Sequence, residues 1–142
     1  MNRYVNESNQ QVTKLRYNNF TKKINGKELN FEIHSNVKNF SKSDWRRVVA
    51  VFVQGSDWEF SDWPKNETPT SILLKVNGFH LKYSDLPVQE NIKKWNVKVL
   101  EIHRNKRHID VSVQNEFWTL MEQFLRQPRY REKSNKTINN SL

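Results

Sequence analysis

The chain has 142 residues, 35% of them hydrophobic and 12% aromatic, which suits one domain with a buried core. The absence of cysteine excludes disulfides, zinc ribbons and thiol catalysis, and favours a reducing intracellular compartment. The net charge of +9 lies in the ends, because residues 44–125 carry eleven basic and eleven acidic side chains. Since no apolar run reaches the roughly 18 residues of a membrane span, we expect no membrane contact.

The two ends differ in composition from the middle. Residues 1–28 are rich in Asn, Gln, Lys and Thr without periodicity, and we predict a mostly disordered polar segment. Residues 128–142 are predicted to form a basic disordered tail. Between them, residues 29–127 are predicted to form one domain. Basic ends add non-specific attraction to nucleic acid or acidic partners, but they do not define what the domain recognises.

The first elements expected along the chain are strands. Residues 31–34 alternate in polarity and predict a short edge strand. Residues 47–53 are apolar on both faces and β-branched, which is typical of a central strand covered on both sides in a parallel sheet. An aromatic and acidic loop, residues 56–64, follows this strand.

Helices and strands then alternate. Thr68 and Pro69 predict a capped helix over 69–77 that ends at Gly78. Alternation predicts strands over 79–83 and from Trp95 to about Ile102, with a one-turn helix near 88–93 between them. Asp110 or Ser112 is expected to cap a last helix, closed by Pro128, whose apolar stripe faces the core: Val113, Phe117, Leu120, Met121 and Phe124. This order indicates a mixed sheet covered by helices.

A string of aromatic and basic residues extends over residues 31–126 in one unbroken order. It comprises the run from Asp44 to Gly55, Trp58, Phe60, Trp63-Pro64, Phe79-His80-Leu81-Lys82-Tyr83, Lys94-Trp95, Val99-Leu100-Glu101, Lys106-Arg107-His108, Asp110 and Phe117-Trp118. This string resembles the carboxy-terminal domain of parafibromin. The resemblance implies an α/β, Ras-like (GTPase-like) mixed sheet flanked by helices, without a nucleotide-binding site. Because family members carry a long amino-terminal region, the chain is either part of a longer protein or a shortened relative.

A Ras-like fold raises the hypothesis of a GTPase, which the motifs do not support. Gly55 follows the apolar strand, but Phe60 stands where the phosphate-binding motif G-x-x-x-x-G-K-[ST] needs its second glycine. Ser61-Asp62 replace the lysine and the hydroxyl that would meet phosphates and magnesium. The motifs Asp-x-x-Gly and Asn-Lys-x-Asp are absent as well. We therefore expect no nucleotide, no cofactor and no enzymatic activity.

A basic loop before the last helix is the first candidate for partner binding. It contains His103, Arg104, Lys106, Arg107 and His108. Guanidinium groups at this density suit phosphate or carboxylate ligands, although a solvated turn explains them equally well from composition alone. His103 and His108 lack the neighbouring ligands of a metal site, so no metal is expected. Given the resemblance, we hypothesise that the loop meets an acidic or phosphorylated peptide.

Two further groups are candidates for partner contacts. Trp58 and Trp63 lie in the aromatic loop, where a core lid is the more common role and an exposed hot spot the alternative. Arg46 and Arg47, just before the central strand, are the other pair.

The resemblance implies a nuclear, non-catalytic protein-interaction domain in a subunit of the polymerase-associated factor complex. Its expected partners are RNA polymerase II, through its phosphorylated carboxy-terminal repeats, other subunits of the complex and, indirectly, chromatin. The expected role is recruitment of the complex during transcription elongation. The alternative is a basic nucleic-acid-binding module that acts through residues 103–108 and the tails, which the neutral middle of the chain disfavours.

Overall fold

A six-stranded mixed sheet forms the centre of the computed structural model, which describes residues 17–127 and 135–140. The strand order is β1-β2-β6-β3-β4-β5, and only the pair β1–β2 is antiparallel. The strands are β1 (Tyr17–Ile24), β2 (Lys27–His34), β3 (Val48–Phe52), β4 (Asn77–Tyr83), β5 (Val97–Ile102) and β6 (Asn135–Asn140). The mixed sheet expected from the element order is therefore confirmed.

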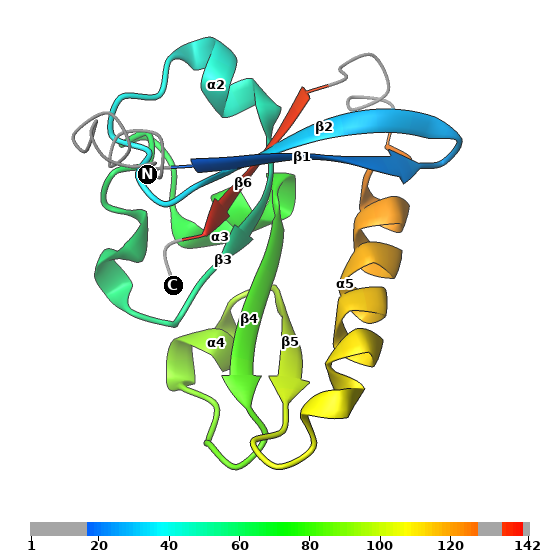
Figure 1. Cartoon of the computed structure of the whole chain (residues 1–142). Helices are drawn as coiled ribbons and strands as arrows, with labels where there is room; N and C mark the ends of the chain where they lie inside the picture. The colour runs from blue at the N-terminus through cyan, green and yellow to red at the C-terminus, as the bar shows by residue number, and fades with distance from the viewer. Residues whose placement is uncertain (1–16, 128–134, 141–142) are drawn as a thin grey trace, which may run out of the picture.

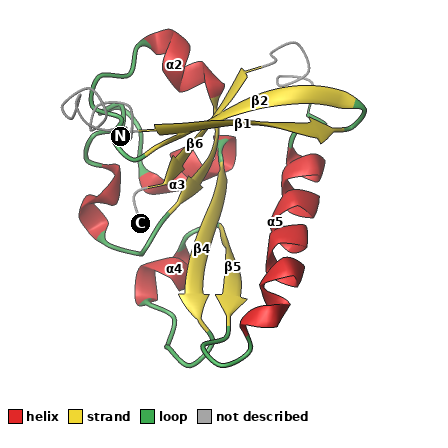
Figure 2. Ribbon diagram, in the orientation of Figure 1, coloured by secondary structure: helices red, strands yellow, loops and turns green. Residues whose placement is uncertain are grey.

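Helices cover both faces of this sheet (Figures 1 and 2). The helices are α2 (Lys42–Arg47), α3 (Pro69–Lys75), α4 (Glu90–Lys94) and α5 (Asp110–Phe124), with short 3₁₀ turns η1 (Asp57–Phe60) and η2 (Arg107–Ile109). Met121 and Leu125 join the apolar cluster under α5, while Ile72 and Ile92 join a second cluster under α3 and α4. The sheet is thus the middle layer of three, and the apolar stripe of the last helix faces the core as predicted.

Strand β3 has the central place that its sequence predicts. It lies between β6 and β4, and its apolar side chains serve both core clusters. Val49 and Ala50 pack under α5, whereas Val48 and Val51 pack on the opposite face. A strand buried on both faces has no place for polar residues, which explains its uniformly apolar composition.

Helix α3 starts as predicted and ends earlier. The Thr68 hydroxyl accepts a hydrogen bond from the Ser71 amide at 3.1 Å, and Pro69 is the first helical residue. The helix stops at Lys75, so Gly78 lies inside β4 and does not terminate it. A Cβ at Gly78 would approach Leu73 Cδ2 to 2.5 Å and Val97 Cγ1 to 2.9 Å. The glycine is needed because α3 packs this closely onto the sheet.

Both predicted disordered ends contribute strands, so the domain is wider than residues 29–127. Within 1–28, residues 17–24 form β1 and residues 27–28 begin β2. Asn25 and Gly26 connect the two strands with φ of 52° and 81°, the Asn-Gly signature of a two-residue hairpin. Strand β2 is internal and not the predicted edge strand, because β1 pairs along its outer side. Residues 1–16 lie outside the described residues.

The predicted basic tail supplies β6, which occupies a place at the centre of the sheet. It pairs in parallel with β2 on one side and β3 on the other. Ile138 reaches the core under α5, while Lys136, Thr137 and Asn139 are also buried. The polar composition of residues 135–140 gives no indication of a strand, because the place of β6 depends on backbone pairing with β2 and β3. The remaining tail residues, 128–134 with the predicted closure at Pro128 and 141–142, are outside the described part.

The last helices differ from prediction by a few residues. Helix α4 spans Glu90–Lys94, slightly later than the expected 88–93. Asp110 is the first residue of α5 and not its cap, since the 3₁₀ turn η2 leads directly into the helix.

Candidate functional site

The loops that follow β3, β4 and β5 lie together at one edge of the sheet, because these strands are parallel. The basic loop, residues 103–108, follows β5 at this edge (Figure 1). The turn after β4 lies beside it, since the Ser84 amide donates to the Ile102 carbonyl at 2.8 Å. The buried Lys82 Nζ holds that turn through the carbonyls of Tyr83 at 3.0 Å and Leu86 at 2.7 Å. The basic loop is therefore placed against a braced turn.

Among the cations of the basic loop, Arg104 is held in the position that best suits binding of an anion. Its guanidinium carbon lies 3.9 Å from the centre of the Tyr83 ring, and its Nε donates to Asp85 Oδ2 at 2.9 Å. Within the described residues no other hydrogen bond uses this side chain, which is 49% exposed. The cation–π contact and one ion pair hold the guanidinium, while its two terminal nitrogens make no hydrogen bond with a described residue.

The other residues of the basic loop differ in their contacts and exposure. Arg107 donates through Nε to Asp110 Oδ2 at 2.9 Å, which raises the pKa of the guanidinium and keeps it charged. His103 Nδ1 lies 3.0 Å from the Ser84 hydroxyl, whereas Lys106 and His108 are exposed. No group of three potential metal ligands forms anywhere in residues 17–127 and 135–140. The loop thus gathers cations without the donor set of a metal site.

The two tryptophans of the aromatic loop have opposite surroundings. Trp58 is 72% exposed and borders a hollow of about 270 Å³ at the edge where β3 ends. Trp63 is 6% exposed, with its ring centre 4.7 Å from that of Trp45 and 5.4 Å from that of Phe60. Trp58 remains a candidate contact through its exposed ring, whereas Trp63 packs in the core and leaves little of its surface exposed.

A carboxylate of the chain itself occupies the loop after β3, where a Ras-like GTPase would hold phosphate. Glu59 accepts hydrogen bonds from the backbone amides of Gln54, Gly55 and Ser56 at 2.5–2.6 Å. Three converging amides form an anion-binding nest, and Gly55 supports it with φ of 109°. An external phosphate would have to displace Glu59 from all three amides. The Ser56-x-x-Glu59 spacing of a capping box is the sequence signal that could have revealed this contact.

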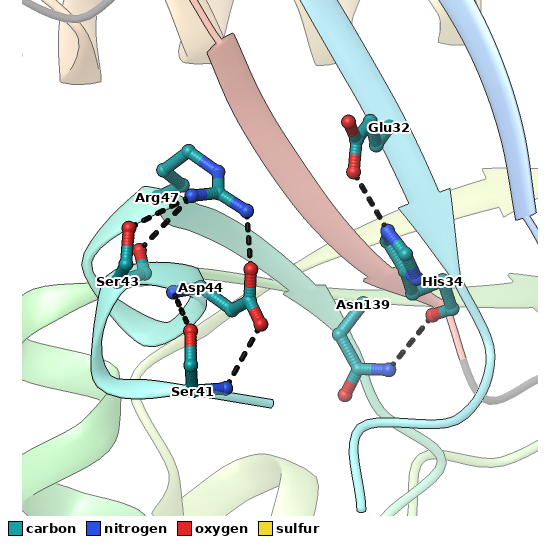
Figure 3. A network of polar contacts seen from close by, with 7 residues as sticks. All are labelled: Glu32, His34, Ser41, Ser43, Asp44, Arg47 and Asn139. Carbon is teal, nitrogen blue, oxygen red and sulfur yellow. Dashed lines mark hydrogen bonds and ion pairs between the residues drawn. The ribbon is translucent and has the colours of Figure 1, made fainter. Parts of the chain in front are cut away.

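Arg46 and Arg47 are neighbours with different surroundings. Arg47 pairs with Asp44 and donates to the Ser43 hydroxyl at 3.1 Å, so it belongs to the network around α2 (Figure 3). Arg46 is exposed and makes no hydrogen bond or ion pair with the residues that the structure describes. The same figure shows Asn139 of β6 donating to the His34 carbonyl at 3.0 Å. Of the two arginines, Arg46 is the one whose charge is open to a partner.

The Asp44 carboxylate predicts a pH effect on stability. The Ser41 amide and the Arg47 guanidinium hold the pKa of Asp44 below its ordinary value. A lowered folded-state pKa stabilises the fold above the unfolded pKa, and this stability is lost as pH falls through the folded value. We expect the free energy of unfolding to fall below about pH 4, and to fall less steeply in Asp44→Asn. Urea unfolding from pH 7 to pH 2.5 measures both curves, and parallel curves would contradict the assignment.

The helices of the described ranges include none that is both long and apolar enough to span a membrane.

Sequence similarity assigns the chain to a family. A family model described as "RNA pol II accessory factor, Cdc73 family, C-terminal" matches residues 2–124. The chain belongs to the Cdc73 C-terminal family. The resemblance to parafibromin is thereby confirmed, and the match starts well before the predicted domain boundary at residue 29.

Curated Cdc73 proteins of distant eukaryotes are similar to this Cdc73-family chain. A Caenorhabditis elegans "Cell division cycle protein 73" is 35% identical over 103 residues, which are 72% of this chain and 20% of that protein. An Arabidopsis thaliana "Protein CDC73 homolog" is 40% identical over 98 residues, which are 68% of this chain and 23% of that protein. The chain therefore spans about a quarter or less of these relatives.

A solved structure shows the same architecture as this Cdc73-family domain. The "conserved domain of yeast Cdc73" superposes with a TM-score of 0.74 at 30% identity, covering 81% of this chain and 74% of that one. The predicted α/β, Ras-like class is confirmed by this match.

Proposed function

We propose that the chain is a non-catalytic protein-interaction domain of a Cdc73-type subunit, which helps recruit a polymerase-associated complex to RNA polymerase II and chromatin in the nucleus. Membership of a family described as an RNA polymerase II accessory factor supports this assignment. The Glu59 carboxylate in the phosphate-binding position supports a binding role over nucleotide turnover, because a nucleotide would have to compete with an intramolecular ligand.

The observation that carries the binding site is the guanidinium of Arg104. Tyr83 and Asp85 fix it, so little conformational entropy is lost when its free nitrogens meet an anion. Lys106 and Arg107 add positive charge in the same loop, and His108 adds a further donor. The proposed ligand is an acidic or phosphorylated segment, of which the carboxy-terminal repeats of the polymerase are the first to test.

A charge-reversal experiment tests this site. Arg104→Glu combined with Arg107→Glu is expected to weaken binding of phosphorylated polymerase repeat peptides at least tenfold, because charge-assisted hydrogen bonds contribute about 1.5–3 kcal/mol each. Fluorescence polarisation measures the affinity, with unphosphorylated peptide, random duplex DNA and a GTP analogue as competitors. Arg104→Lys keeps the charge and loses the fork, so an intermediate affinity is expected.

The matched control reverses the same number of charges elsewhere. Lys94→Glu with Arg126→Glu changes two exposed cations at the ends of α4 and α5. If this control variant weakens binding of the peptide as much as the loop variant does, binding depends on net charge and not on the Arg104 site. Binding of DNA alone, falling steeply with salt, would replace the proposal with the nucleic-acid-binding alternative.

A further inference from the structure

A second surface feature lies at the opposite edge of the sheet from the basic loop. A pocket of about 330 Å³ opens where α2 leads into β3 and α3 leads into β4. Its lining residues are Trp45, Arg46, Val48, Trp63, Pro64, Glu67, Ile72, Lys75 and Val76. The basic loop follows the other end of the sheet, where Ile102 pairs with Tyr83 at the end of β4. The two features therefore do not form one site.

The floor of this pocket is apolar and well supported. Val48, Trp63, Ile72 and Val76 are each 2–7% exposed and belong to one core cluster. The half-buried ring of Trp45 tilts against Trp63, with the two ring centres 4.7 Å apart. A hollow of this size with a rigid aromatic and aliphatic lining suits a bulky apolar side chain.

The charged residues at the rim indicate the charge of the ligand group that lies next to this apolar side chain. Glu67 is neutralised within the rim, because it pairs with Lys75 and accepts from the Ser71 hydroxyl at 2.8 Å. These two partners hold the pKa of Glu67 below its ordinary value, so it stays ionised and paired. Arg46 is the remaining charge, and no described residue pairs with it. The rim therefore has an excess of one positive charge directly beside the apolar floor.

We infer that this pocket binds an acidic linear segment of a partner protein, with one aromatic side chain on the apolar floor and an adjacent carboxylate paired to Arg46. Burial of the aromatic ring supplies affinity, and the guanidinium fork fixes the register of the carboxylate. This goes beyond the proposed function, because it uses another edge of the sheet and requires neither phosphate nor the basic loop. A partner could occupy both edges at once and gain from the linkage.

The experiment uses a fluorescein-labelled peptide, Asp-Glu-Asp-Phe-Glu-Asp-Glu, and the full chain. Resonances of the five indole N–H groups are followed by NMR, since Trp45 and Trp63 line the pocket while Trp58, Trp95 and Trp118 do not. We expect saturable shifts of the Trp45 and Trp63 signals and none at the other three. Replacing Phe by Ser in the peptide is expected to weaken binding at least tenfold, because the ring supplies most of the apolar surface buried in the pocket.

Protein variants separate this pocket from general charge and from the basic loop. Arg46→Glu is expected to weaken binding of the peptide about tenfold or more. Lys93→Glu, which changes an exposed cation on α4, is expected to leave the affinity unchanged. Arg104→Glu with Arg107→Glu is also expected to leave the affinity for this peptide unchanged. The experiment therefore tests the pocket independently of the basic loop. Equal binding by Arg46→Glu, equal binding of the Ser peptide, shifts centred on Trp58, Trp95 or Trp118, or no binding at millimolar peptide would each overturn the inference.

Discussion

A chain that ends at Ser134 is expected to lose its cooperative unfolding transition. This truncation removes β6 and leaves β2 and β3 without their shared neighbour at the centre of the sheet. The backbone N–H and C=O groups of β2 and β3 that pair with β6 would lose their hydrogen-bond partners. Unpaired strand edges also promote self-association. Thermal unfolding by circular dichroism, with size-exclusion chromatography, measures the outcome.

The control for this truncation is a chain that ends at Asn140, which keeps all of β6. We expect its melting temperature to equal that of the full chain. A milder change in the same strand, Ile138→Ala, is expected to cost about 2–4 kcal/mol, because Ile138 is 3% exposed in the core under α5. If the chain ending at Ser134 melted within a few degrees of the full chain, β6 would not be an integral strand of this sheet.

Replacement of Glu59 by Ala is expected to lower the free energy of unfolding by about 2 kcal/mol. The carboxylate satisfies three backbone amides, and its loss leaves them without an acceptor from the protein. Because Glu59 is only half-buried, water replaces part of the interaction and keeps the cost moderate. Urea denaturation at pH 7 measures the difference, and Glu59→Gln should lie between the two proteins, since it retains one acceptor oxygen.

Asp62 provides a matched control in the same aromatic loop. It is exposed and makes no hydrogen bond or ion pair among residues 17–127 and 135–140. Asp62→Ala should therefore change stability by less than about 0.5 kcal/mol. A Glu59→Ala protein as stable as Asp62→Ala would show that the nest does not depend on this carboxylate.

The candidate contacts could be chosen from the sequence, but their roles could not. The density of cations in residues 103–108 was visible, whereas the acids that orient them, Asp85 and Asp110, were not identified as their partners. Asp85 lies nineteen residues before Arg104 and meets it only because β4 and β5 are adjacent. Likewise, two similar tryptophans proved to be one exposed ring and one core ring. Exposure depends on what packs above a side chain, which the local sequence does not contain.

The sequence by itself determined the elements whose stability is local or strongly apolar, namely the central strand β3, the Thr68-capped helix α3 and the stripe of α5. Periodicity, capping and burial on both faces leave direct marks on the residues that form them. Only the tertiary structure decided that Asn-Lys-Thr-Ile-Asn-Asn completes the centre of the sheet and that Glu59 fills the nest after β3. The strand depends on backbone hydrogen bonds that almost any side chain permits, so its place is set by β2 and β3, which need a partner. The nest depends on three backbone amides that converge on the Glu59 carboxylate only once the loop has folded.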